Sequence, residues 1–449
     1  MFGTSGIRGP VGEEITATLA LSVGRALASE GNRRVVVGRD VRESGTFLHE
    51  ALAAGVQECG ADVVDVGVAA TPTVARAVST LEADAGVVIT ASHNPPTDNG
   101  VKLWTPSGKA FGPDRREAIS RRLREDDYDL AAWDELGSRR SCETTAADAH
   151  VRSLRESVSV SRTDAPNVVV DLGNGAAGST ARVLHDLGCT VRTLNGQEDG
   201  SFPGRPSEPT RETLTDLMCM VAETDADLGI AHDGDGDRML AVDGTGAFVP
   251  KDALLALFAV DAAGSGDRVA APVDTSLAVD DALADVGASL TRTRVGDVYV
   301  AERTAESDVV FGGEPSGAWI WPDQTLCPDG PLAACKLVEL VSRDGPLSEL
   351  VSDIETYPIE RDSIEVTEKS AVMERVRERV ERRYDVAEPG IEIDTRDGVR
   401  VSLTDGWFLV RKSGTQPLVR VTAEARDEAV ARELFHNARE LVRNATADH

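Results

Sequence analysis

Short apolar runs that alternate with helical spacing are the feature that most constrains the fold of this chain. The run RVVVG at residues 34–38 is typical of a strand, and residues 46–59 follow with helical spacing. Another strand is expected at 62–66, then a helix opened by Thr71-Pro72, then a strand at 86–90. Because proline is favoured at the start of a helix and this alternation builds βα units, the pattern predicts an α/β fold with mostly parallel sheets.

The same alternation continues through the first three quarters of the chain. One strand begins at Asn167, another covers residues 228–233, and a third covers residues 309–317. Each of them, like the strand that ends at Thr90, leads into a polar, glycine-rich loop; the loop after Thr90 is expected at 92–100. In open α/β sheets the carboxyl ends of the strands form the edge where ligands bind. These loops are therefore the expected functional site.

The pattern changes after Tyr357, where helices at 370–383 and 428–442 accompany strands at 398–403 and 407–410. This composition predicts a small α+β domain. A chain of 449 residues also exceeds what one hydrophobic core usually covers. We therefore expect α/β domains at residues 1–145, 146–245 and 246–355, with mixed, mostly parallel sheets, and an α+β domain at 356–449.

The formal net charge of −29 excludes a general nucleic-acid binder, because phosphate backbones require a basic surface. No run of about 18 apolar residues occurs and no apolar leader opens the chain, so we expect a cytoplasmic protein without a membrane partner. The six cysteines form no CxxC pair and are expected to be reduced. We hypothesise that the excess acid suits a salt-rich cytoplasm; the alternative is a charge that only aids solubility.

The segment AHDGDGDRM places three carboxylates at alternate positions, Asp233, Asp235 and Asp237. Glycines between them let the backbone curl so that the side chains converge, and hard oxygen ligands of this kind suit Mg²⁺. A calcium EF-hand loop is excluded because its sixth and twelfth positions would be Arg238 and Gly244. A phosphatase with an aspartyl nucleophile and a solvated acidic turn both stay open for this segment taken alone.

The segment TASHNPPTDNGVK presents Ser92 directly after a buried strand, with His93 beside it and two prolines that stiffen the loop. Rigid placement of a hydroxyl is what phosphoryl transfer needs. Lys102 follows on a strand that could return toward the serine. Acyl transfer is disfavoured because Gly-x-Ser-x-Gly is missing. The alternative is an ordinary Pro-Asn turn with a capping serine.

Three further segments have phosphate-binding or sugar-binding composition. RKSGTQP combines Arg411, Ser413, Gly414 and Thr415, which are residue types that supply the charge and the hydrogen-bond donors for binding a dianionic phosphate. GGEPSG offers Glu314 and Ser316 for sugar hydroxyls, although this segment and RKSGTQP could each be a polar turn, and FGTSGIRG offers Arg8 for phosphate. GNGAAG at 173–178 matches a dinucleotide fingerprint, but the next strand ends in Asn195 instead of an acid, so tight packing is the preferred explanation.

Taken in order, FGTSGIRG, TASHNPP, DGDGDR, GEPSG and RKSGTQP closely resemble the motifs of the α-D-phosphohexomutase family, from Phe2 to Pro417. The resemblance implies three related α/β domains and a smaller fourth domain around a central cleft. It also implies an intramolecular phosphotransferase that interconverts hexose 6-phosphate and hexose 1-phosphate through phosphoserine and a bisphosphate intermediate. The implied partner is a hexose phosphate, and the protein would be a monomer or homodimer.

The resemblance also implies a role for each matched residue. The phosphorylated serine would be Ser92, and Mg²⁺ would be held by Ser92 and the three aspartates. Lys102 would be a general acid or base, and Arg8, His93 and Arg238 would complete the catalytic group. The sugar would be bound by Glu314 and Ser316, and the phosphate that does not react by Arg411, Ser413, Gly414 and Thr415.

Two positions depart from the family pattern. Many members continue the sugar loop to a histidine where this chain has Ala318, so one contact is lost or supplied elsewhere, and Gln416 replaces a usual glutamate. The stretch RVGDVYV at 294–300 resembles that of phosphoglucosamine mutases, which favours glucosamine phosphate as substrate. Mannose or glucose phosphates stay open, as do, from other classes, a non-catalytic sugar-phosphate-binding protein and an NAD-dependent oxidoreductase.

Overall fold

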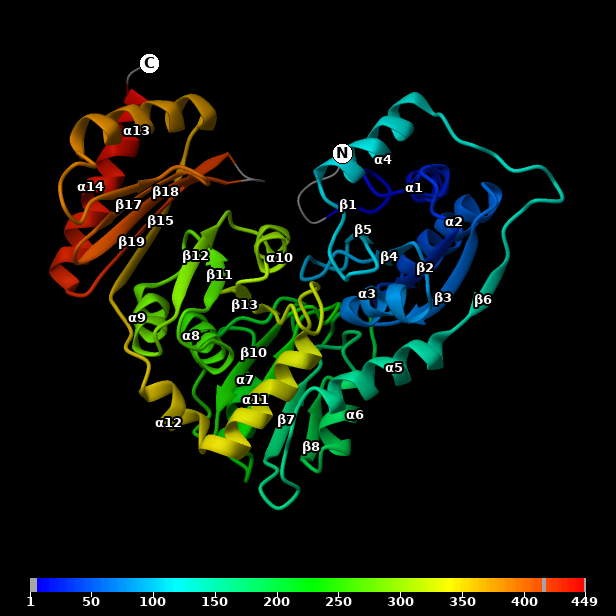
Figure 1. The fold of residues 1–449 in the computed structure, drawn as a ribbon, viewed down its shortest axis with the longest axis horizontal. Helices are drawn as coiled ribbons and strands as arrows, with labels where there is room; N and C mark the ends of the chain where they lie inside the picture. Colours follow the sequence, from blue (N-terminus) through cyan, green and yellow to red (C-terminus); the bar gives the residue numbers. More distant parts are fainter. Residues whose placement is uncertain (1–5, 414–416, 448–449) are drawn as a thin grey trace.

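The computed structural model describes residues 6–413 and 417–447, whose strands form four separate sheets (Figure 1). In Figure 1 the C-terminal sheet lies on the left and the N-terminal sheet on the right, the third sheet lies between them, and the second sheet lies below. Among these residues, none of the helices has the length and apolarity needed to cross a membrane. The expected α/β fold with a C-terminal α+β part is confirmed.

The first sheet has six strands in the order β1-β5-β4-β2-β3-β6. Its centre is parallel, whereas β5 pairs antiparallel with both β4 and β1. Side chains alternate between the faces, so that Val35 and Val37 pack under α1 and α2 while Val36 and Val64 pack under α3. The elements are β1 (Ile7–Pro10), α1 (Ala17–Ser29), β2 (Arg34–Arg39), α2 (Gly45–Glu58), β3 (Asp62–Val68), α3 (Thr71–Thr80), β4 (Ala85–Ile89), β5 (Asp98–Trp104), α4 (Pro113–Glu125) and β6 (Arg139–Ser141).

The second and third sheets have four strands each, in the orders β10-β9-β7-β8 and β12-β11-β13-β14. In both sheets three strands are parallel and one edge strand is antiparallel. One continuous core, from Val151 to Leu347, joins them. The elements are α5 (Glu143–Glu156), β7 (Asn167–Asp171), α6 (Ser179–Asp186), β8 (Thr190–Leu194), α7 (Thr215–Ala222), β9 (Leu228–His232), β10 (Met239–Asp243), α8 (Lys251–Ala262), β11 (Arg268–Pro272), α9 (Leu277–Asp285), β12 (Ser289–Thr293), α10 (Asp297–Thr304), β13 (Val309–Glu314), β14 (Ala318–Ile320), α11 (Gly330–Asp344) and α12 (Leu347–Ser352).

The fourth sheet is antiparallel throughout, in the order β15-β19-β18-β17-β16. Its two helices cover one face with Val376 and Ala438 in the core. On the other face, Trp407 and Leu409 pack against Val273, which follows β11 of the third sheet. Below, the first to fourth units are the four sheets with the helices that are given with each. The elements are β15 (Ile359–Glu365), α13 (Lys369–Arg383), β16 (Glu392–Asp394), β17 (Val399–Leu403), β18 (Gly406–Lys412), β19 (Leu418–Ala425) and α14 (Glu428–Ala447).

Two predicted boundaries were wrong. The single strand expected at 309–317 is a β-hairpin, because Gly317 has a φ of +99° that turns the chain between β13 and β14. The loop expected at 92–100 ends earlier, since β5 already begins at Asp98, where it pairs with Pro10.

Candidate active site

The three alternate aspartates lie in the loop between β9 and β10, and all three side chains are buried. One oxygen from each of Asp233, Asp235 and Asp237 lies within 4.8 Å of the others. The loop can curl because Gly236 has a φ of +69°. A side chain at Gly234 would put its Cβ 2.9 Å from the carbonyl oxygen of Ser92. The glycines thus allow both the convergence and the close approach of the serine loop.

Ser92 lies directly against this cluster, although it belongs to the first sheet and the aspartates to the second. Its Oγ donates to Oδ2 of Asp233 at 2.8 Å and lies 3.4 Å from Oδ1 of Asp237. The side chain is buried, and φ is +54°, a left-handed value that few residues other than glycine adopt. The hydroxyl that the sequence predicted as a positioned group is therefore fixed beside the predicted metal ligands.

Lys102 reaches the cluster from β5, whose hairpin with β4 places it opposite Val88. Its Nζ lies 2.8 Å from Oδ2 of Asp235 and 2.6 Å from Oδ2 of Asp237. Burial lowers the pKa of Lys102, but the two carboxylates outweigh burial and raise that pKa above its usual 10.5. The lysine is therefore held as an ammonium two contacts away from the serine.

The carboxylates of the cluster are crowded. Burial and the neighbouring acids raise the pKa of Asp233 and of Asp237, while burial of Asp235 is outweighed by Lys102 and the hydroxyl of Thr71, which lower its pKa. Oδ2 of Asp235 accepts from both of these partners, yet its Oδ1 is buried without a hydrogen bond among the described residues. Buried oxygens without a partner destabilise a fold, so the donor set fits a divalent cation such as Mg²⁺.

Three further predicted residues surround this cluster. The backbone N–H of Arg238 donates to Oδ1 of Asp233 at 3.1 Å. Arg8 lies on β1 opposite Gly100, and a Cβ on Gly100 would lie 2.9 Å from Cγ of Arg8. Burial, followed by Arg238 and Arg8, lowers the pKa of His93 to about 2. His93 is therefore a neutral imidazole among cations.

The predicted sugar-binding residues lie at the turn between β13 and β14, where Oγ of Ser316 donates to Oε2 of Glu314 at 3.1 Å. This turn is joined to the loop at 233–238 that carries the three aspartates, called the metal loop below. The backbone N–H of Met239 donates to the carbonyl of Gly317, and the backbone of Arg238 bridges to that of Ala318. Burial and Asp297 raise the pKa of Glu314 to about 7, against the opposing charge of Arg238.

Arg411 lies elsewhere, on β18 of the fourth sheet, and Ser413 follows it with a buried side chain. Gly414 and Thr415 fall outside the described residues. Arg411 lines a pocket of about 450 Å³ together with Arg361, Arg420 and Asp274 of the third unit. The structure therefore gathers the other predicted catalytic residues around Ser92, and it places Arg411 at a separate, basic pocket.

Sequence reasoning missed Arg361 and Arg420. Register reveals them, because Arg411 and Arg420 are directly opposed on β18 and β19, and Ser363 is opposite Arg420 on β15. Arg361 is two residues from Ser363, so all three arginines share one face of the sheet. The alternation Val419-Arg420-Val421 in β19 was a signal for Arg420, but Arg361 is flanked by Glu360 and Asp362, and the strand pairing could not be read from either segment.

The glycine loop at 173–178 packs against the loop of the three aspartates. A Cβ on Gly175 would lie 2.7 Å from the carbonyl oxygen of Gly234, and Ala176 donates to that carbonyl at 3.1 Å. A Cβ on Gly173 would lie 2.6 Å from the guanidinium of Arg205. These two close approaches require Gly173 and Gly175, in place of the strand–helix packing that the sequence indicated, whereas a Cβ on Gly178 would meet nothing within 4 Å.

A serine hydroxyl beside a buried three-carboxylate cluster, with a separate basic pocket on the fourth sheet, defines a class of enzyme that handles phosphorylated substrates. Sequence profiles agree. Those of phosphoglucomutase/phosphomannomutase alpha/beta/alpha domains I, II and III match residues 1–129, 148–246 and 250–357, and that of the C-terminal domain matches 364–441.

The chain belongs to the phosphoglucomutase/phosphomannomutase family and is a phosphohexomutase. It is 47% identical to a protein of Methanopyrus kandleri described as a probable phosphoglucosamine mutase, over 100% of this chain and 98% of that one. A protein of Methanothermobacter thermautotrophicus with the same description is 46% identical, over 99% and 98%.

Solved structures show the same fold. A phosphoglucomutase/phosphomannomutase family protein from Burkholderia thailandensis superposes with a TM-score of 0.88 at 29% identity, over 99% of this chain and 98% of that chain. The N-acetylphosphoglucosamine mutase of Aspergillus fumigatus, solved with GlcNAc-6P and magnesium, superposes with a TM-score of 0.59 at 15% identity, over 99% and 96%.

Proposed function

We propose that this phosphohexomutase interconverts glucosamine 6-phosphate and glucosamine 1-phosphate through a phosphorylated Ser92 and a bisphosphate intermediate. The observation that supports this most is the 2.8 Å contact between Oγ of Ser92 and Asp233 inside a buried carboxylate cluster. We place the reaction in the cytoplasm, in a monomer or homodimer whose domains are residues 1–145, 146–245, 246–355 and 356–449.

Mg²⁺ would be held by Asp233, Asp235 and Asp237, with an oxygen of phosphorylated Ser92 as a further ligand. When bound, the ion would neutralise charge on the phosphoryl group. Two features support this: the orphaned Oδ1 of Asp235 and the description of the Aspergillus fumigatus enzyme with magnesium.

In the transfer step, a sugar hydroxyl attacks the phosphorus, its new O–P bond forms, and the Oγ–P bond of Ser92 breaks. The hydroxyl proton ends on Oγ of Ser92. Lys102 is held as an ammonium next to Asp237, so we assign it as the acid that protonates the serine oxygen. The proton released by the sugar hydroxyl then restores the ammonium, so that the net proton transfer is from that hydroxyl to Oγ. Arg8 and Arg238 would stabilise the charge on the transferring group, and neutral His93 would donate a hydrogen bond to it.

The other end of the substrate would be bound away from the serine. Glu314 and Ser316 would contact the sugar hydroxyls, and Arg411, Ser413, Gly414 and Thr415 would bind the phosphate that does not react. We add Arg361 and Arg420 to that phosphate site, because both line the pocket of Arg411 and no ion pair of either occurs within the described residues. The intermediate then turns over, so that its two phosphates exchange these sites.

The choice of glucosamine rests on the two archaeal relatives described as probable phosphoglucosamine mutases, both matched along nearly their whole length. Ala318, where the sequence departs from many members, is buried in β14, and its backbone bridges to Arg238 beside the loop of the three aspartates. Mannose and glucose phosphates are the competing substrates.

The experiment is a panel of glucosamine, mannose and glucose 6-phosphates assayed with Mg²⁺ and a catalytic amount of bisphosphate. We expect the highest kcat/KM with glucosamine 6-phosphate, and Ser92→Ala to lose more than about 1,000-fold because no neighbouring group can replace the nucleophile. Ser265→Ala, which removes an exposed hydroxyl from the loop between α8 and β11, is the matched control. Equal turnover by Ser92→Ala would contradict the proposal.

A further inference from the structure

Arg42 lies beneath the loop that carries Ser92, and nothing in the motifs above assigns it a role. Its side chain is fully buried. The guanidinium donates to three backbone carbonyls of that loop, those of Ser92 at 2.8 Å, Asn94 at 2.6 Å and Pro95 at 2.5 Å, and to the carbonyl of Asp98, the first residue of β5, at 3.0 Å. The guanidinium is planar and carries several N–H donors, so it can reach carbonyls that lie in different directions. A buried arginine with these contacts holds the backbone of the loop in place.

A second set of hydrogen bonds ties the same arginine to the amide of Ser92. Asp40 pairs with Nε of Arg42 at 3.0 Å, and its Oδ2 accepts from the hydroxyl of Thr90 at 2.7 Å. Oγ1 of Thr90 in turn accepts from the backbone N–H of Ser92 at 2.8 Å. Both the N–H and the C=O of the serine are therefore fixed from one buried ion pair.

This fixation explains how Ser92 keeps its unusual backbone. A φ of +54° is unfavourable for a residue with a Cβ and persists only where the surroundings determine it. Released from Arg42 and Thr90, the serine would relax toward negative φ, and its Oγ would swing away from Asp233.

The second unit closes over the arginine. The ring centroid of Phe202 lies 5.1 Å from the guanidinium carbon of Arg42, and Oγ of Ser207 donates to the carbonyl of Asn94 at 2.9 Å. A Cβ on Gly200 would lie 2.6 Å from Cα of Arg42. The long loop from 197 to 211 therefore packs against both Arg42 and the loop of Ser92.

We propose that Arg42 is a positioning residue for phosphoryl transfer, which holds Ser92 in its left-handed conformation and so sets the distance between Oγ and the carboxylate cluster. The inference rests on the proposed function for its kinetic readout, but the conformation of the loop can be measured without any substrate.

The test compares Arg42→Lys with the wild type. Lysine keeps the positive charge beside Asp40 but has a single nitrogen, which cannot reach four carbonyls. We expect kcat to fall on the order of 100-fold, the loss that a displacement of about 1 Å causes. KM should stay within about threefold, because the residues assigned to the sugar and to the distant phosphate are untouched. Hydrogen exchange at residues 92–98 should rise while the rest of the chain is unchanged.

Thr90→Val and Thr90→Ser keep the test decisive if Arg42→Lys fails to fold. Thr90→Val should lower kcat by a smaller factor than Arg42→Lys does. Thr90→Ser, which retains the hydroxyl, should have the kcat of the wild type. Arg139→Lys is the stability control, because Arg139 pairs with Asp65 and Glu50 at the far edge of the same sheet.

The outcomes distinguish the positioning role of Arg42 from the proposed mutase function. If the wild type interconverts hexose phosphates and folded Arg42→Lys or Thr90→Val keeps wild-type kcat, the positioning role is wrong. An equal fall in kcat in Arg139→Lys would likewise overturn it, because general destabilisation would then explain the loss. If the wild type has no mutase activity, the proposed function fails, and unchanged exchange at 92–98 in Arg42→Lys would overturn the inference separately.

Discussion

The hydroxyl of Thr71 donates a 2.7 Å hydrogen bond to Oδ2 of Asp235, and the backbone N–H of Thr71 donates to the carbonyl oxygen of Asp235 at 2.8 Å. Thr71 begins α3 in the first unit, whereas Asp235 lies in the metal loop of the second. Because Thr71 and Lys102 both occupy Oδ2, only Oδ1 is left to face a cation. The site is therefore complete only when the two units are seated together.

Thr71→Val should weaken the binding of Mg²⁺ by about 10-fold to 100-fold, the usual effect of losing a hydrogen bond to a metal ligand. The measurement is calorimetric titration of the protein with Mg²⁺, and with Mn²⁺ as a second probe. Thr71→Ser retains the hydroxyl and should bind like the wild type. Unchanged affinity in the valine variant would show that the hydroxyl does not orient Asp235.

Arg420→Gln should raise KM for the hexose phosphate roughly 10-fold or more with a smaller change in kcat, because a charge-assisted contact to the distant phosphate contributes about 1.5–3 kcal/mol. Steady-state kinetics provides the measurement. Arg382→Gln, on the exposed side of α13, is the matched control and should change nothing. A KM equal to that of the wild type would remove Arg420 from the phosphate site.

Much of this arrangement could be predicted from sequence. The sequence shows where buried strands end, because runs of Val and Ile give way to glycine and polar residues. This pattern identified the loops at Ser92 and Asp233. What could not be predicted depends on contacts between units. The roles of Arg42 and Thr71 at the site leave no local signal, since they exist only once a loop 50 residues away, or an aspartate 164 residues away, is folded against them.

The activity should depend on pH through Glu314. Its pKa is raised from 4.5 to about 7, so the side chain holds its proton up to that pH and becomes a carboxylate only above it. A carboxylate accepts stronger hydrogen bonds from sugar hydroxyls. We therefore expect kcat/KM to fall as the pH drops through about 7, and the profile to lose this limb in Glu314→Gln. A limb that persists in the glutamine variant would assign the titration to another group.

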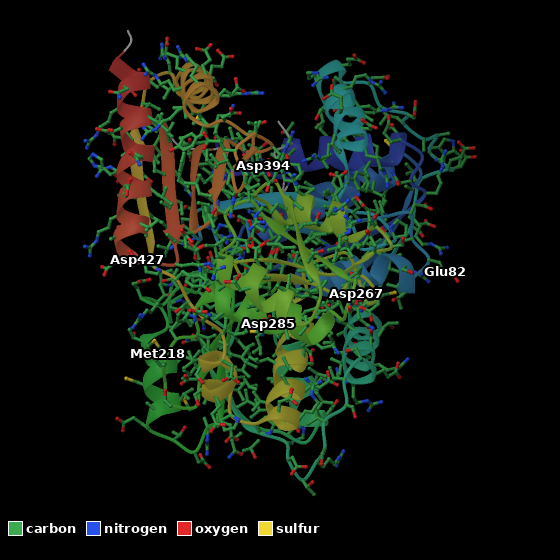
Figure 2. The ribbon with its side chains drawn as sticks, turned by 60° about the vertical axis from the view of Figure 1, so that its left-hand side comes forward. Glu82, Met218, Asp267, Asp285, Asp394 and Asp427 are labelled. Carbon is green, nitrogen blue, oxygen red and sulfur yellow. The ribbon has the colours of Figure 1, made fainter. Side chains whose placement is uncertain are left out.

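Salt should stabilise the fold. The net charge of −29 is spread over the surface, where Glu82, Asp285 and Asp427 lie on three different units (Figure 2). Salt screens repulsion between such exposed charges over about 10 Å at 0.1 M and less at higher concentration. The midpoint of thermal unfolding should rise from low to molar KCl. A midpoint that stays constant would leave solubility as the explanation of the acidic surface.

The central claim is that Ser92 carries the phosphoryl group, and a single-turnover experiment tests it most directly. Protein phosphorylated with labelled bisphosphate is mixed with glucosamine 6-phosphate, quenched over time and digested for mass spectrometry. The account predicts that the label begins on the peptide containing Ser92 and moves to the sugar at a rate no slower than kcat. Label on another residue, or a phosphoserine that does not transfer at that rate, would contradict it.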